Sequence, residues 1–147
     1  MHGPATLEAL DELIRAAASV EPAVARRAGL STSELQALRY LVDGSRGPVE
    51  LSHLLGVTSA ASSGVVDRLA ARGHVRRRPH PADGRRTQVE ITGSGRQALD
   101  SLLEPMQARL AAVDASLGED ERTAVGRYLT RVTEVLKIGR ASCRERV

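Results

Sequence analysis

Aromatic residues are almost missing from this chain of 147 residues, which has two tyrosines and neither phenylalanine nor tryptophan. A buried core must therefore consist of leucine, valine and alanine, and side chains of this size favour closely packed helices. The rest of the composition is ordinary for a globular protein, with 41% hydrophobic and 27% charged residues. The length fits one compact domain.

Long apolar runs are also absent, since none approaches the roughly 18 residues of a membrane span. The first residues lack the basic-then-apolar order of a signal peptide, so we expect a cytoplasmic protein without a membrane partner. The sequence has no phosphate-binding loop, nucleophile elbow or zinc-protease pair, and no two histidines lie at metal-ligand spacing. Gly93–Gly95 superficially resembles a phosphate loop but fits better as a helix start capped by Thr92. We predict no enzyme, metal or cofactor.

The one cysteine, Cys143, lies within Ile138–Val147, which matches one reading frame of a common sequencing-adapter oligonucleotide. We interpret this segment as non-native read-through, the alternative being a natural basic tail. Residues 1–137 then contain no cysteine, so they can form neither a disulfide nor a thiol switch. Without the segment, which carries three arginines and one glutamate, the formal net charge falls from +3 to +1.

Positive charge is concentrated between Arg72 and Arg86, where six arginines accompany one acid, Asp83. This stretch of fifteen residues therefore carries a net charge of +5. A nearly neutral chain with one strongly basic segment is typical of a surface that faces phosphates.

Two short helices are predicted on either side of Gly56. Ser31 and Glu34 form a capping box for a preceding helix that ends near Gly44, and Pro48 fits the first turn of the next helix. Gly56 is a natural left-handed cap, and Thr58 is a good N-cap for a helix that ends at Gly73. On this last helix we expect one face (Ala61, Val65 and Leu69) toward the core and another (Ser59, Ser62, Ser63 and Val66) outward. The arrangement is a helix-turn-helix.

A basic hairpin is predicted after this motif. Val75–Arg78 and Thr87–Ile91 have strand character, and the residues between them, rich in proline, glycine and aspartate, favour a tight tip. A helix-turn-helix followed by a hairpin defines a winged helix. The predicted fold class is therefore mainly α with a small β-wing.

Helical stripes flank the winged helix on both sides. Thr6–Ala28 is one predicted helix, which Pro22 should kink or break, and a second begins after Thr92 and should bend at Pro105. Gly118 separates it from a last helix. These apolar stripes exceed what one small domain can cover, so we expect a homodimer. The predicted organisation of residues 1–137 is a single domain, with a winged helix at about 31–92 and dimerisation helices at 6–28 and 93–137.

The pattern resembles the MarR family of transcription regulators. The resemblance lies in Leu30–Leu38, Leu51–Thr58, Val65–Leu69 with Gly73 and Val75–Arg77, and Asp83–Arg85 followed by Val89–Thr92 and Gly95. It implies a homodimer that binds double-stranded DNA, with recognition helices in successive major grooves, wings at the minor groove, and a small-molecule effector. Gly64 departs from the many relatives that have a basic or polar residue there.

Each candidate site residue has a structural alternative. Arg85 resembles a wing-tip arginine that enters the minor groove, and Asp83 would hold its guanidinium in a bidentate pair, unless the hairpin is merely solvated. Ser59 and Ser63 are candidates for base edges or bridging waters, unless they form an ordinary polar face. Tyr40 either lines a ligand pocket or packs in the core. The predicted DNA-binding residues are Thr58, Ser59, Ser62, Ser63, Arg68, Arg76, Arg77, Arg78, Asp83, Arg85 and Arg86.

The predicted function is a sequence-specific transcription regulator, chiefly a ligand-responsive repressor on a palindromic operator. One alternative is a winged-helix module for protein interaction, against which the wing-tip arginine argues. Another is a non-specific architectural DNA binder, against which the serine face and the two-fold symmetry argue.

Overall fold

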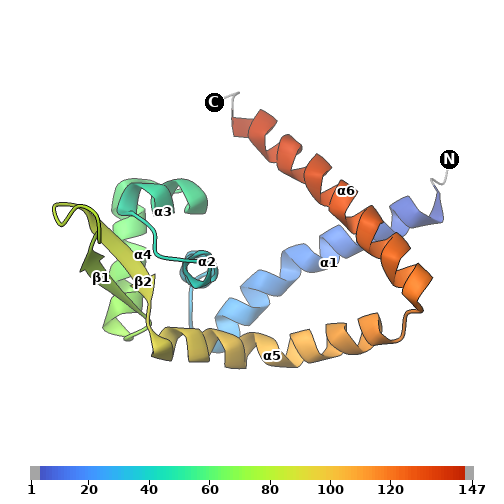
Figure 1. The fold of residues 1–147 in the computed structure, drawn as a ribbon, viewed down its shortest axis with the longest axis horizontal. Coiled ribbons are helices and arrows are strands. Elements are labelled where there is room, and N and C mark those ends of the chain that lie inside the picture. Colours follow the sequence, from blue (N-terminus) through green and yellow to red (C-terminus); the bar gives the residue numbers. More distant parts are fainter. Residues whose placement is uncertain (1–3, 145–147) are drawn as a thin grey trace. The chain divides into compact units, whose positions relative to one another are not determined.

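A computed structural model describes residues 4–144, with side chains described for residues 4–138. It is mainly helical with one small antiparallel sheet, as the sequence predicts (Figure 1). The chain divides into two compact units, one ending at Glu104 and one beginning at Pro105. In chain order the elements are α1 (Ala5–Ala28), α2 (Thr32–Val42), α3 (Pro48–Leu55), α4 (Ser59–Ala71), β1 (Val75–Pro79), β2 (Thr87–Ile91), α5 (Gly93–Ala115) and α6 (Glu119–Arg144).

Local capping sets the helix boundaries in the first unit. The Ser31 hydroxyl accepts a hydrogen bond from the Glu34 N–H at 3.1 Å, and the Glu34 carboxylate accepts one from the Ser31 N–H at 3.3 Å. Gly56 ends α3 with a φ of 67°, and the Thr58 hydroxyl accepts from the Ala61 N–H. The predicted capping box, glycine cap and threonine cap are therefore confirmed.

Of the predicted kink or break at Pro22, the break is wrong, because α1 runs without interruption through this residue. The alanine-rich sequence before Pro22 has high helix propensity, and the loss of one backbone hydrogen bond there is not enough to end the helix. Helix α5 likewise continues through Pro105, the residue at which the second unit begins.

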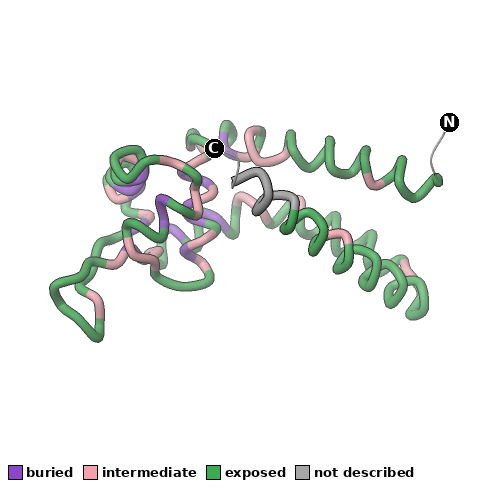
Figure 2. The backbone as a smooth tube through the Cα atoms, turned by 90° about the horizontal axis from the view of Figure 1, so that it is seen from above, coloured by how far each residue is buried: buried purple, intermediate pink, exposed green. Residues whose placement is uncertain are grey.

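Among the described residues, the buried hydrophobic side chains of the first unit are all aliphatic, as the lack of aromatic residues predicts, and the half-buried Tyr40 packs against them. Buried side chains gather on α2, α3 and α4 and on the sheet, whereas most of α1 is exposed (Figure 2). The largest fully buried side chains are Leu35, Leu38, Leu41, Leu51, Leu69 and Val89. Helix α5 contributes Leu99, which ties the residues after the sheet to this core.

The sheet pairs β1 with β2 in an antiparallel register that joins Val75 to Ile91 and Pro79 to Thr87. A further bridge joins Arg46 to Val89 through two backbone hydrogen bonds of 2.9 and 2.8 Å. The sequence does not predict this bridge, since one residue in a loop has no strand periodicity. It fastens the segment before α3 to the wing.

The second unit consists of the end of α5 and helix α6, joined by a turn in which the Gly118 N–H donates to Glu121 at 2.7 Å. Its apolar side chains are mostly exposed, including Leu110 at 60% and Val135 at 67%. Helix α6 extends to Arg144, into the segment interpreted as read-through. Among the described residues, no helix has the combination of length and apolar character that a membrane crossing requires.

Candidate nucleic-acid interface

Helices α3 and α4 form the helix-turn-helix. Gly56 adopts the left-handed conformation at the end of α3, and the Val57 N–H donates to the Ser52 carbonyl at 3.1 Å. Thr58 then starts α4. Because no Cβ opposes the positive φ of Gly56, the chain can reverse within three residues. This geometry presents α4 as the recognition helix.

The faces of α4 differ from those predicted. Ser62 and Val66, expected on the outer face, are only 2% and 3% exposed, whereas Ala61, expected in the core, is exposed. The buried stripe consists of Ser62, Val65, Val66 and Leu69, because a spacing of i, i+3, i+4, i+7 fits one helix face better than the steps of four that we assumed. Ser62 is therefore withdrawn as a DNA-contacting residue.

The outer face of α4 carries small and polar side chains. Ser59, Ala60, Ser63 and Asp67 are exposed, and Thr58 is exposed at the start of the helix. Spacing of four residues places Ser59, Ser63 and Asp67 on one line along the helix. Side chains this small let the helix backbone approach a duplex closely.

Two arginines of β1 share one carboxylate across the hairpin. Glu90 lies opposite Arg76 in the register, and it accepts hydrogen bonds from Arg76 and, at 3.1 Å, from Arg78. The hydrogen bond from Arg76 is the main reason that the pKa of Glu90 is lowered; partial burial opposes this effect, and Arg78 adds to it. Arg76 and Arg78 are thus partly neutralised by the wing itself.

Arg77 lies on the opposite face of β1 and connects the wing to the recognition helix. Its guanidinium donates to Asp67 at 2.7 Å, and both side chains are substantially exposed. The pair neutralises the one carboxylate on the outer line of α4, which would otherwise repel a phosphate.

The wing tip is closed by backbone hydrogen bonds. The His80 N–H donates to Arg86 at 2.8 Å, and the Arg86 N–H donates to the Asp83 carbonyl at 3.0 Å. The Asp83 carboxylate accepts from the backbone N–H of Arg85 at 3.1 Å, so it shapes the turn; the predicted bidentate pair with the Arg85 guanidinium is wrong. An Asp side chain reaches the N–H two residues ahead more readily than a long, solvated guanidinium.

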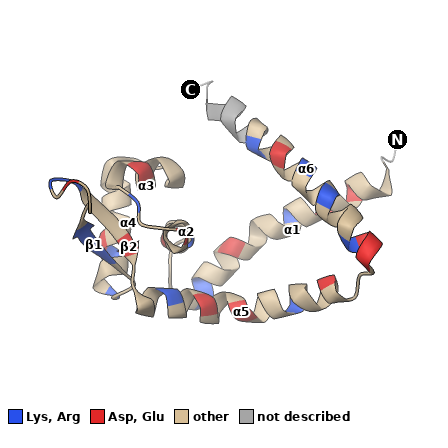
Figure 3. Ribbon diagram, viewed as in Figure 1, with Lys and Arg blue, Asp and Glu red and all other residues tan. Residues whose placement is uncertain are grey.

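The uncompensated positive charge of the wing is therefore at its tip. Within residues 4–138, no ion pair involves the guanidinium of Arg85 or Arg86, whereas Arg76, Arg77 and Arg78 each have a carboxylate partner. Figure 3 shows basic residues along β1 and at the tip of the hairpin. Arg85 and Arg86 are the side chains best placed to attract a polyanion.

Arg68, predicted to bind DNA, instead contacts a buried carboxylate. Its Nε donates at 2.6 Å to Glu34, which is only 4% exposed. Burial raises the pKa of Glu34, but the hydrogen bonds from Arg68 and the Ser31 N–H, together with the charges of Arg68 and Arg72, outweigh it and lower this pKa. No local sequence pattern indicates this contact, because 34 residues separate its two partners.

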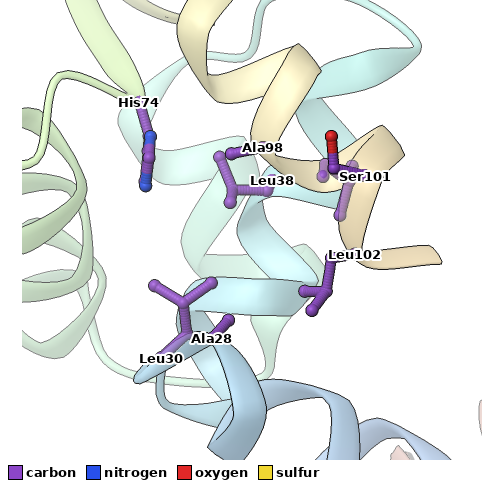
Figure 4. Close-up of a pocket in the computed structure, with 8 residues that line it drawn as sticks. Ala28, Leu30, Leu38, His74, Ala98, Ser101 and Leu102 are labelled. Atoms are coloured by element: carbon purple, nitrogen blue, oxygen red, sulfur yellow. The ribbon is translucent and has the colours of Figure 1, made fainter. Parts of the chain in front are cut away.

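A cavity of about 330 Å³ lies beside the end of α4, within the first unit. His74, directly before β1, projects toward it, as do side chains from α5 and from the junction of α1 and α2 (Figure 4). Within the described part of the chain, the buried Nδ1 of His74 has no hydrogen-bond partner. Tyr40 does not line this cavity; it packs against the core. The lining residues are Ala28, Leu30, Leu38, His74, Ala98, Leu99, Ser101 and Leu102.

A recognition helix that is followed by a basic wing defines a winged helix-turn-helix protein, the class of DNA-binding transcription regulators. Among the described residues, no cluster of histidine, cysteine and acidic side chains could hold a metal ion.

Comparison with known proteins agrees with the class of winged helix-turn-helix regulators: a model of the MarR family matches residues 28–86. The HTH-type transcriptional repressor YetL of Bacillus subtilis is 30% identical over 113 residues, which cover 75% of this chain and 68% of that protein. The chain belongs to the MarR family.

Solved structures show the same fold. The transcriptional regulator Tm0710 of Thermotoga maritima superimposes with a TM-score of 0.66 at 26% identity, covering 92% of this chain and 96% of that one. Bordetella bronchiseptica BpsR, whose DNA binding is regulated by 6-hydroxynicotinic acid, has a TM-score of 0.52 at 23% identity, covering 84% and 91% of the two chains.

Proposed function

We propose that this chain is a sequence-specific, ligand-responsive transcriptional repressor that binds a palindromic operator in the cytoplasm as a homodimer. The observation that carries the proposal is the combination of a recognition helix whose outer face has small side chains with two wing-tip arginines that have no ion pair within residues 4–138. The small side chains permit α4 to approach base edges, and the two arginines provide positive charge for the minor groove or its phosphates. Repression is the function of the relative YetL.

Different residues are proposed to contact different parts of the duplex. Ser59 and Ser63 are proposed to reach base edges directly or through water, and Thr58 to contact a phosphate at the start of α4. Arg85 is proposed to enter the minor groove with Arg86 beside it. Asp83 contributes by shaping the tip. Phosphate contacts are proposed for the three arginines of β1, Arg76, Arg77 and Arg78. Their carboxylate partners neutralise only part of their positive charge.

The homodimer is supported by apolar surface on the outer helices. Leu7 and Leu13 of α1 are each 53% exposed, and Leu129 of α6 is 42% exposed. Leucine and valine in this number are unfavourable in contact with water, and a second copy of the chain with the same stripes would cover them. In a two-fold dimer, the two recognition helices would read an inverted repeat.

The DNA-reading function is tested by selecting from a randomised duplex library with the full chain. We expect enrichment of an inverted repeat whose half-sites lie about 10 base pairs apart, since each α4 would enter one of two successive major grooves. Sedimentation of the free protein should give twice the chain mass. Binding without any enriched sequence would favour an architectural DNA binder, and a monomer that binds no duplex would favour the protein-interaction module.

The effector is proposed to occupy the cavity beside α4. Its walls are mostly apolar, and the unpartnered Nδ1 of His74 offers one polar contact to a small ligand. His74 directly follows the end of the recognition-helix segment at Gly73, so a ligand there would lie where α4 and the wing meet. BpsR provides a family precedent for regulation by a small heteroaromatic acid.

Filling the cavity tests this site. In a panel of small aromatic acids that includes 6-hydroxynicotinic acid, we expect at least one compound to raise the melting temperature of the protein and to weaken its binding to the selected duplex. Both effects should disappear in Ala98→Leu, which adds bulk to the cavity wall, and persist in Ser94→Leu on the first turn of the same helix. Equal responses in the two variants would place the effector elsewhere.

A further inference from the structure

A nearly buried carboxylate, that of Glu34, contacts the C-terminal half of the recognition helix. Glu34 is 4% exposed and both of its oxygens are engaged: Oε2 accepts from the Ser31 N–H at 3.3 Å, and Oε1 accepts from Arg68 Nε at 2.6 Å. One contact closes the start of α2, and the other reaches across to α4. Glu34 thus links the capping of one helix to the placement of another.

A second arginine, the C-cap residue of α4, makes a similar contact one turn later. The Arg72 guanidinium donates to the carbonyls of Ala28 at 3.4 Å and Gly29 at 2.6 Å, where α1 ends. These carbonyls have no partner within their own helix. Arg68 and Arg72 are four residues apart and lie on the same side of α4. The recognition helix is therefore attached at two points to the α1–α2 junction.

The side chain of Arg68 runs along the surface of α4 toward Gly64, one turn earlier in the helix. Its Nη1 is so close to Gly64 that a Cβ at this position would lie 3.4 Å from it. The missing side chain at Gly64 leaves room for the guanidinium beside the helix, on its way to Glu34. A charge-assisted hydrogen bond of 2.6 Å to a buried acceptor has a strong orientational preference.

We propose that Glu34 and Arg68 are positioning residues that set the orientation of the recognition helix, and that Arg68 acts through Glu34 and makes no phosphate contact of its own. The inference rests on the proposed DNA-reading function. It explains why an arginine of the recognition helix, although its side chain is 57% exposed, holds its Nε against a nearly buried carboxylate when DNA would be its other partner. Removing either member of the pair should impair sequence reading more than the general attraction to DNA.

The test compares variants on the duplex selected by the wild-type protein and on a scrambled duplex of equal length. Glu34→Gln removes a negative charge, which by electrostatics alone would tighten binding to any DNA. Positioning predicts the opposite for the selected duplex: affinity about tenfold weaker, with unchanged or tighter binding to the scrambled duplex and an unchanged salt slope. Glu21→Gln, which removes a half-buried carboxylate with partners on α2, is the matched control and should keep the wild-type specificity ratio.

Variants at Arg68 separate the two roles. Arg68→Met should reduce the specificity ratio as much as Glu34→Gln, and the double variant should be no worse than either single one, because both remove the same contact. Arg68→Lys retains the charge and the fold but not the Nε hydrogen bond, and it should also lose specificity. A phosphate contact would instead survive in Arg68→Lys, and its loss in Arg68→Met would lower the salt slope by about one unit per contact.

Urea unfolding of each variant confirms that the fraction assayed is folded, and Arg68→Lys replaces Arg68→Met if the latter unfolds at the assay temperature. A wild-type specificity ratio in Glu34→Gln overturns the positioning role and leaves the DNA-reading function intact. If the wild-type protein enriches no sequence at all, the proposed function fails first.

Discussion

Replacing Arg85 with alanine is expected to weaken binding to the selected duplex about 5- to 150-fold for one wing, the equivalent of roughly 1–3 kcal/mol. The reason is that Arg85 lies at a turn shaped by Asp83 and has no ion-pair partner within residues 4–138, so its charge is available to the duplex. In a homodimer two wings bind one operator, and the loss should approximately double in free energy. The measurement is a fluorescence-anisotropy titration on selected and scrambled duplexes at several salt concentrations.

Three variants serve as controls for Arg85→Ala. Asp83→Ala should weaken binding less, because the arginine survives while its turn loosens. Arg77→Ala should weaken binding to all sequences similarly, apart from any effect of freeing Asp67. Arg109→Ala removes the same charge from an exposed position in the second unit and should bind as the wild type does. If Arg85→Ala binds the selected duplex as tightly as the wild type, the wing does not read DNA.

Replacing Gly95 with alanine is expected to cost about 3 kcal/mol of unfolding free energy, the upper part of the range for overpacked sites, and to lower the melting temperature by roughly 10 °C. A Cβ at this buried position would lie 2.1 Å from the carbonyl oxygen of His74 and 2.8 Å from its carbonyl carbon. Both are backbone atoms at the start of the wing, so relief requires α5 or β1 to move. Thermal and urea unfolding measure the effect.

The control for Gly95→Ala is two residues away. Gly93 begins the same helix, and a Cβ there would have no neighbour within 4 Å. Gly93→Ala should change the unfolding free energy by less than about 1 kcal/mol, in the stabilising direction, because it restricts the unfolded chain. Similar melting temperatures for the two variants would show that α5 does not pack as closely on His74 as the structure indicates.

Local signals in the sequence were enough to predict most elements of this fold. The capping box at Ser31, the glycine cap at Gly56 and the alternating residues of β2 each act within a few neighbours, so a single sequence contains them. The faces of α4 were harder to predict. Serine and alanine are small enough for either environment, and only the packing of α2 and α3 against α4 decides that Ser62 is buried and Ala61 exposed.

Interactions between distant segments could not be predicted in the same way. The pairing of Glu34 with Arg68 spans 34 residues, and the bridge of Arg46 to Val89 spans more, so neither has a local pattern. Any of the arginines near Arg68 was an equally plausible partner for Glu34 from the sequence alone. The predicted partner of Asp83 is also wrong. A carboxylate close to two arginines in sequence suggests an ion pair, whereas in the structure it accepts a hydrogen bond from the backbone N–H of Arg85.

The hydroxyl of Thr92 has a consequence for the entropy of DNA binding. It donates to the Gly73 carbonyl at 2.6 Å and accepts from the Gly95 N–H at 3.0 Å, so it fastens together the two chain segments from which the wing emerges. Strands β1 and β2 are paired along their length, and Arg46 forms a backbone bridge to Val89 in β2. Before DNA binds, the conformational freedom of the wing is therefore limited mainly to its side chains and to the turn formed by residues 80–86. Only this freedom is lost when the duplex binds. Since fixing each backbone residue costs about 1–2 kcal/mol, a wing anchored at its base keeps most of the affinity that its arginines provide.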